Sequence, residues 1–151
     1  LRTCLLGGLS ALSGPLHGGA TARARAFVDS VSTTESAEDA VRARLDRGEV
    51  LAGFGHRLYP EGDPRAAELL AHVRCPETDR LIAAVDSVAG LKPTIDMALV
   101  AVEISHGLHK GAALDLFTIG RAAGWMAHAI EQRLRGHLIR PRARFVGDTG
   151  L

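Results

Sequence analysis

Residues 113–135 read ALDLFTIGRAAGWMAHAIEQRLR, and this stretch decides the fold class. Apolar side chains recur along it at the spacing that places them on one face of an α-helix. They are Leu116, Ile119, Ala123, Met126, Ala127, Ile130 and Leu134. Gly136 follows as a helix stop, and small residues such as Gly120 and Gly124 allow another helix to approach closely. The stretch therefore predicts one long helix with an apolar face.

Shorter helical patterns precede this stretch. Ser36 is a helix cap with Gly48 as its stop, and Asp63 followed by Pro64 is a helix start. The predicted helices cover about 1–12, 20–31, 36–47, 64–73, 77–88 and 94–105. The segment 49–60 reads as an extended loop or a pair of very short strands. No alternation of strands and helices occurs, so the sequence predicts an all-α fold.

Composition excludes several classes of function. A formal net charge of +1 over 151 residues argues against a general nucleic-acid binder or a polybasic membrane anchor. No apolar run is long enough to span a bilayer. Cys4 and Cys75 are too few for a disulfide framework, which favours a reducing compartment and a cytoplasmic location. The sequence starts at Leu1, inside a helical pattern, and we expect it to be a piece of a longer protein.

A glycine-flanked histidine is the first candidate for a functional group. His56 lies in the run GFGHRLY at 53–59, and Asp63 and Arg65 follow in the next helix start. Glycines let backbone approach a ligand, a helix N-terminus favours an anion, and arginine can bind a carboxylate through two hydrogen bonds. This segment predicts a pocket for a small carboxylic acid.

His17 and Asp96 are the second and third candidates. His17 lies in the loop GPLHGGA at 14–20, before a helix that would favour its neutral form, which can stabilise an enolate oxygen. Asp96 opens an apolar helix, where a partly buried carboxylate can act as a base. Simpler interpretations stay open, because His17 could cap a turn and acids favour the first helical turn for electrostatic reasons alone.

Two further patterns concern charge and metal binding. Arg121 is flanked by small and apolar residues in the middle of a helix, so it needs either a buried acid or a ligand carboxylate as partner. His106, His109 and Asp115 have weak metal-ligand spacing, and we interpret them as surface or capping residues. No metal site is predicted.

Together these segments resemble the citrate synthase family. The matching runs, in family order, are GPLHGGA at 14–20, GFGH at 53–56 with DPR at 63–65, TID at 94–96, RAAGWMAH at 121–128 and RPR at 140–142. They extend over nearly the whole chain. The resemblance implies condensation of acetyl-CoA with oxaloacetate followed by hydrolysis of the citryl thioester, with coenzyme A as part of the substrate and no separate cofactor.

The resemblance also implies a role for each site residue. Asp96 would remove a proton from the acetyl group, His17 would hydrogen-bond the thioester oxygen, and His56 would polarise the ketone. The carboxylates of oxaloacetate would be bound by Arg65, Arg121 and, from a neighbouring subunit, Arg140. Coenzyme A would be bound by Gly53, Phe54, Gly55 and Arg57, mainly through the backbone of the glycine loop.

For the architecture, the resemblance implies a homodimer of all-α subunits with two domains. Residues 19–107 would be a small mobile domain, while 1–18 and 108–151 would be pieces of a large domain. Closure of the two domains would exclude water before condensation. The segment 116–134 would pack against the second subunit.

Several residues depart from the family pattern and leave alternatives open. They are Thr21 and Ala22 after the His17 loop, Pro60, Thr94 and Phe145. The part of the family that lies upstream is also missing from this sequence. A 2-methylcitrate synthase that uses propionyl-CoA, a non-catalytic protein that binds CoA thioesters or dicarboxylates, and half of a split enzyme all remain compatible with the same residues.

Overall fold

The computed structural model describes residues 1–31, 36–140 and 146–147, and that part contains seven helices and no strand beyond isolated bridges. The predicted all-α fold is confirmed. None of the helices in the described ranges is both long and apolar enough to cross a membrane. The helices are α1 (Arg2–Leu12), α2 (Gly19–Ser30), α3 (Ala37–Asp46), α4 (Pro64–His72), α5 (Pro76–Ala89), α6 (Ile95–Ser105) and α7 (Ala112–Arg135).

The helix ends follow from local chemistry. The Asp63 carboxylate caps α4 by accepting the Arg65 backbone N–H at 3.1 Å, and Pro64 occupies the first helical position. Gly90 and Gly136 end α5 and α7 in the left-handed conformation, with φ of 65° and 66°. Observed helix ends therefore lie within one or two residues of the predicted ones.

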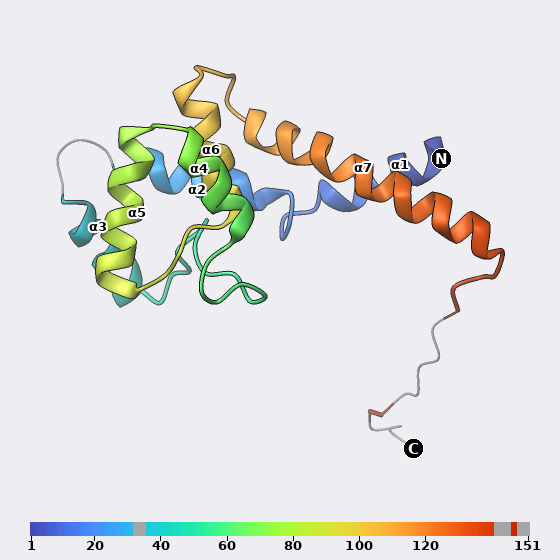
Figure 1. The fold of residues 1–151 in the computed structure, drawn as a ribbon. Helices are drawn as coiled ribbons and strands as arrows, with labels where there is room; N and C mark the ends of the chain where they lie inside the picture. The colour runs from blue at the N-terminus through green and yellow to red at the C-terminus, as the bar shows by residue number, and fades with distance from the viewer. Residues whose placement is uncertain (32–35, 141–145, 148–151) are drawn as a thin grey trace.

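The core lies among helices α2 to α6. Figure 1 shows these helices gathered in one cluster. Residues Met97 to Ala101 of α6 are all buried, which explains why this helix is apolar around most of its circumference. Helices α2 and α4 pack on α6, and α3 packs on α5. The cluster thereby fixes the N-terminal end of α6, where Asp96 lies.

Helices α1 and α7 form a second, elongated unit. In Figure 1, α7 extends away from the cluster and α1 lies along it, in agreement with their packing contacts. A Cβ atom on Gly8 would lie 2.8 Å from the Trp125 ring, so glycine is required for this close approach. The opposite apolar side chains of α7 are uncovered: Ile119, Met126, Ile130 and Leu134 are all exposed.

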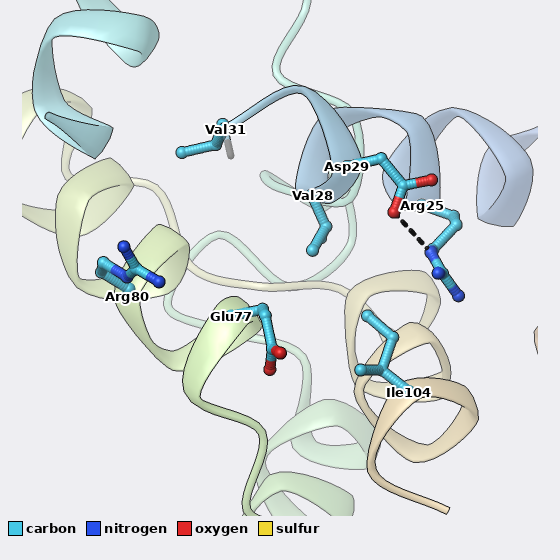
Figure 2. Close-up of a pocket in the computed structure, with 7 residues that line it drawn as sticks. All are labelled: Arg25, Val28, Asp29, Val31, Glu77, Arg80 and Ile104. Atoms are coloured by element: carbon cyan, nitrogen blue, oxygen red, sulfur yellow. Dashed lines mark hydrogen bonds and ion pairs between the residues drawn. The ribbon is translucent and has the colours of Figure 1, made fainter. Parts of the chain in front are cut away.

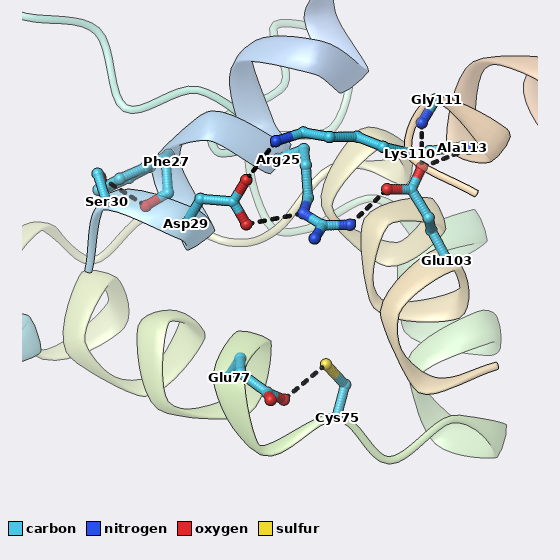
Figure 3. A network of polar contacts seen from close by, with 10 residues as sticks. All are labelled: Arg25, Phe27, Asp29, Ser30, Cys75, Glu77, Glu103, Lys110, Gly111 and Ala113. Carbon is cyan, nitrogen blue, oxygen red and sulfur yellow. Dashed lines mark hydrogen bonds and ion pairs between the residues drawn. The ribbon is translucent and has the colours of Figure 1, made fainter. Parts of the chain in front are cut away.

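A polar network joins α2, α6 and α7 where the two units meet (Figure 3). The Glu103 side chain is only 1% exposed, and it accepts a hydrogen bond from Arg25 at 2.5 Å. Its second oxygen accepts the backbone N–H groups of Gly111 and Ala113, at 3.0 and 2.9 Å, at the start of α7. Arg25 also binds Asp29 at 2.8 Å. One buried carboxylate thus connects three helices.

Candidate active site

The glycine loop at 53–55 is fixed to the segment that leads into α6. The backbone N–H of Gly55 donates to the Lys92 carbonyl at 2.9 Å, and the N–H of Thr94 donates to the Gly53 carbonyl at 2.8 Å. Both glycines have positive φ, 87° and 70°. A Cβ on Gly53 would lie 2.9 Å from the Met97 side chain. These bonds hold the loop against the N-terminal end of α6.

This arrangement brings His56 and Asp96 to one cavity. The cavity has a volume of about 270 Å³. Its lining consists of Ala20, Arg23, Val50, Leu51, Ala52, Gly53, Phe54, Gly55, His56, Thr94 and Asp96. Residues that are 40 positions apart in the sequence, His56 and Asp96, therefore face the same space. The cavity therefore has both the glycine loop and the Asp96 carboxylate in its lining.

Burial raises the pKa of Asp96. Desolvation is the largest cause, and it is opposed by a hydrogen bond from the Thr94 hydroxyl at 3.4 Å and by the charges of His17 and Arg65. His17 lies in the loop before α2, and Arg65 lies in the first turn of α4. A carboxylate in this setting binds a proton more readily than an exposed aspartate, which suits a general base.

The local contacts of His56 define its hydrogen-bonding role. Its Nδ1 lies 3.1 Å from the backbone N–H of Leu58, which donates to it. A neutral imidazole that accepts at Nδ1 carries its proton on Nε2. The ring also packs against Tyr59, with 4.9 Å between the ring centroids. His56 can therefore present an N–H donor to a carbonyl oxygen.

His17 lies in a loop whose next position, Gly18, has room only for glycine. A Cβ on Gly18 would collide with the Leu12 carbonyl oxygen at 1.9 Å. The Gly18 N–H donates to the Gly14 carbonyl at 3.1 Å, which closes the turn. The His17 ring meets Phe117 of α7 edge to face, with centroids 5.1 Å apart. His17 lines a second cavity, of about 190 Å³, together with Gly8, Ala11, Leu12, Arg121 and Trp125.

Arg65 and Arg121 line a third cavity of about 270 Å³. Arg65 binds both oxygens of the Asp63 carboxylate, at 2.9 and 2.8 Å, so its fork is occupied within the chain. Arg121 is exposed, and no acid within residues 1–31, 36–140 and 146–147 pairs with it. No buried acid is therefore found as its partner there, and Arg121 instead lines this cavity and the one that contains His17.

The remaining predicted residues lie outside these cavities or contribute backbone. The Phe54 side chain is buried against Phe27 in the core, with ring centroids 6.2 Å apart. Arg57 is exposed, as is Arg140 at the C-terminal edge of the described part. Phe145 and the RPR run beyond Arg140 lie outside the described residues.

A separate cavity, of about 400 Å³, is larger than these three (Figure 2). It is lined by Arg25, Val28, Asp29, Val31, Glu77, Arg80 and Ile104, none of which was predicted as a site residue. Figure 2 shows the charged groups of both signs around it, with Arg25 bound to Asp29. Elsewhere, His109 pairs with Asp115 at 3.0 Å on the surface. Among the described residues no group of three possible metal ligands occurs.

Comparison with known proteins identifies the family. Residues 1–142 match the family model described as citrate synthase, C-terminal domain. This chain belongs to the citrate synthase family. Its resemblance to that family, expected from the motifs, is confirmed.

Relatives and solved structures agree with this assignment. The putative citrate synthase 2 of Mycobacterium tuberculosis is 39% identical over 97% of this chain and 43% of its own length. The 2-methylcitrate synthase of Shewanella oneidensis is 29% identical over 97% of this chain and 42% of its own length. The crystal structure of Thermotoga maritima citrate synthase superposes with a TM-score of 0.77 at 28% identity, covering 99% of this chain and 44% of that one. This citrate synthase family chain thus spans less than half the length of these relatives.

Proposed function

We propose that this chain carries the thioester-activating part of a citrate synthase-type acyltransferase. The substrates would be acetyl-CoA and oxaloacetate, and the products citrate and free coenzyme A. One observation carries the proposal: Asp96, His56 and the glycine loop at 53–55 face one cavity. A weak carbon acid needs a base and an enolate stabiliser acting together.

In the proposed reaction, the Asp96 carboxylate takes a proton from the acetyl methyl group while His17 hydrogen-bonds the thioester oxygen. The resulting enolate carbon forms a bond to the ketone carbon of oxaloacetate. The ketone oxygen receives a proton from the Nε2–H of His56, which supports this role because its Nδ1 already accepts from Leu58. Water then cleaves the citryl thioester and releases the thiol of coenzyme A.

Binding groups complete the proposal. The carboxylates of oxaloacetate are bound by Arg65, Arg121 and Arg140, the last from a second subunit of a homodimer. Coenzyme A is bound by the backbone of Gly53, Phe54 and Gly55, with Arg57 close to the loop. Because the Nε and Nη2 groups of Arg65 already donate to Asp63, only its remaining N–H groups would bind oxaloacetate.

The domain division at 18/19 and 107/108 belongs to the same proposal. Residues 19–107 include the central cluster, and 1–18 together with 108–151 include α1 and α7. Between them lies the cavity lined by Arg65 and Arg121. Motion of α7 relative to the cluster would therefore change the space around both residues.

A second candidate is 2-methylcitrate synthase, with propionyl-CoA in place of acetyl-CoA. The relative of that name from Shewanella oneidensis favours it, since its match covers 97% of this chain. One extra methylene requires only a slightly larger acyl pocket, and such a difference is worth about 1–3 kcal/mol in discrimination. The two candidates share every proposed catalytic residue.

A segment-exchange protein tests the proposal. Residues 1–142 of this chain replace the matching segment of Thermotoga maritima citrate synthase, and thiol release is followed with oxaloacetate and either acetyl-CoA or propionyl-CoA. We expect oxaloacetate-dependent thiol release with acetyl-CoA as the faster substrate. Faster release with propionyl-CoA would favour the second candidate. A folded protein that binds both thioesters but releases no thiol would contradict both, and would favour a non-catalytic binding protein.

A further inference from the structure

Arg23 is a charged lining residue of the Asp96 cavity that neither the family resemblance nor the sequence patterns single out. It projects from α2, six residues after His17. Its Nη1 donates to the Pro15 carbonyl at 2.5 Å, and its Nη2 donates to the Leu16 carbonyl at 3.0 Å. A Cβ on Gly19 would lie 2.8 Å from Nη1, so glycine there makes room for the guanidinium. The two bonds tie the guanidinium of this exposed side chain to the loop before His17.

The charge of this guanidinium is left uncompensated. Both acceptors are neutral carbonyl oxygens, and no carboxylate in ranges 1–31, 36–140 and 146–147 forms an ion pair with it. By contrast, Arg25, Arg44 and Arg65 each bind a carboxylate. Two bonds to carbonyls leave the remaining N–H groups of the arginine available as donors. Held at a cavity wall, such a cation attracts an anion at little cost in side-chain entropy.

The cavity wall next to Arg23 suits a ligand that approaches backbone closely. Val50, Leu51 and Ala52 line the cavity and directly precede the glycine loop in the sequence. Asp96 lines the same cavity. A carboxylate ligand would be repelled by Asp96, whereas a long ligand can place its anionic part at Arg23 and a neutral part at Asp96. Coenzyme A thioesters have this distribution of charge, because their phosphate groups lie at the far end of the molecule from the uncharged acyl group.

We propose that Arg23 binds a phosphate group of the coenzyme A thioester. The inference rests on the proposed function and deepens it. Because the same guanidinium holds the Pro15 and Leu16 carbonyls, which directly precede His17, phosphate binding at Arg23 also stabilises the loop that positions His17. Arg23 thereby acts as a binding residue for the substrate and a positioning residue for His17.

Calorimetric titration of the 151-residue chain with three ligands tests this role. The ligands are acetyl-CoA, its 3′-dephospho form and acetyl-pantetheine, which has no phosphate group. We expect Arg23→Gln to weaken acetyl-CoA binding about tenfold and to leave acetyl-pantetheine binding unchanged, because only the charge-assisted bonds are lost. Arg23→Lys should keep much of the affinity. The 3′-dephospho form tells which phosphate is bound: if it binds Arg23→Gln and wild type equally, the 3′-phosphate is the partner.

Matched controls separate the outcomes. Arg42→Gln removes a charge from an exposed pair with Asp39, outside the cavity, and should change no affinity. If Arg23→Gln weakens acetyl-CoA and acetyl-pantetheine by the same factor, or weakens neither, the phosphate role is overturned. If the wild-type chain and the segment-exchange protein both fail to bind acetyl-CoA, the proposed function is overturned first, and the inference with it.

Discussion

Asp63 is the side chain through which two helices of the candidate site are connected. Its carboxylate is buried, caps α4, binds the Arg65 guanidinium and accepts the Ile95 backbone N–H at 3.0 Å. Burial acts to raise its pKa, but the bonds from Arg65 and Ile95 outweigh burial, so the net pKa is lowered from its ordinary value of 3.8. Ile95 directly precedes Asp96, which makes Asp63 a structural support of the proposed base.

Replacing Asp63 should therefore cost stability in a pH-dependent way. Asp63→Ala leaves the Ile95 N–H and the Arg65 side chain without an acceptor, and we expect a loss of about 3 kcal/mol in the free energy of unfolding at neutral pH. Since the folded-state pKa is depressed, this contribution is complete above pH 3.8 and is lost as pH falls through the lower folded-state pKa.

Urea unfolding of the wild type and Asp63→Ala between neutral pH and acid checks this expectation. The exposed pair of Asp39 and Arg42 offers a matched control, and Asp39→Ala should cost less than about 1 kcal/mol. A difference between wild type and Asp63→Ala that stays constant down to the most acidic conditions would contradict the assigned pKa direction.

The sequence predicted the capping role of Asp63 but not its bond to Ile95. An acid followed by proline is a local signal for a helix start, and the cap is confirmed. The bond to Ile95 joins residues 32 positions apart, and no local pattern encodes such a contact. Arg65 illustrates the same limit, because its potential for a bidentate bond was recognised, but the choice of Asp63 as partner depends on three-dimensional placement.

At the scale of whole helices, Glu103 determines how α6 meets α2 and α7. Residues 94–105 were predicted as a helix, and α6 spans Ile95–Ser105. A periodic pattern predicts such an element well because neighbouring turns decide it. The partners of Glu103 were not predicted, because Arg25 is 78 positions away in the sequence. The helices were thus predictable, whereas the polar contacts between them were not.

Truncation of Glu103 should destabilise the chain strongly. Glu103→Ala leaves two N–H groups at the start of α7 without acceptors and removes a buried partner of Arg25, so we expect a loss of about 4 kcal/mol. Glu103→Gln should lose less, because its amide oxygen can still accept the backbone N–H groups. Denaturant unfolding measures both. The exposed Glu68→Gln serves as a control, and a Glu103→Ala variant as stable as that control would contradict the network.

For the whole molecule, the uncovered face of α7 is the feature with the clearest consequence. The predicted helix 113–135 is confirmed, but its apolar face is exposed at Ile119, Ile130 and Leu134. An apolar face of this length is unusual on a monomer. Periodicity predicts that such a face exists, but it does not identify what covers the face.

We expect a second copy of the chain to cover it, as in the proposed homodimer. The 151-residue chain should therefore sediment as a dimer or a larger species at micromolar concentration, and Ile130→Asp combined with Leu134→Asp should shift it toward the monomer. Leu45→Asp, which changes a side chain 40% exposed on α3, is the control and should leave the species unchanged. A monomeric wild type would contradict the interface.

The central claim is that Asp96 is the base that activates the thioester, and the segment-exchange protein tests it most directly. Oxaloacetate-dependent thiol release from acetyl-CoA is compared between wild type and Asp96→Asn across a range of pH. We expect the variant to be slower by about a hundredfold or more, with acetyl-CoA affinity unchanged. Because burial raises the pKa of Asp96, the wild-type rate should fall in acid at a pH above 3.8, as the carboxylate gains its proton. An Asp96→Asn protein that releases thiol at the wild-type rate would contradict the account.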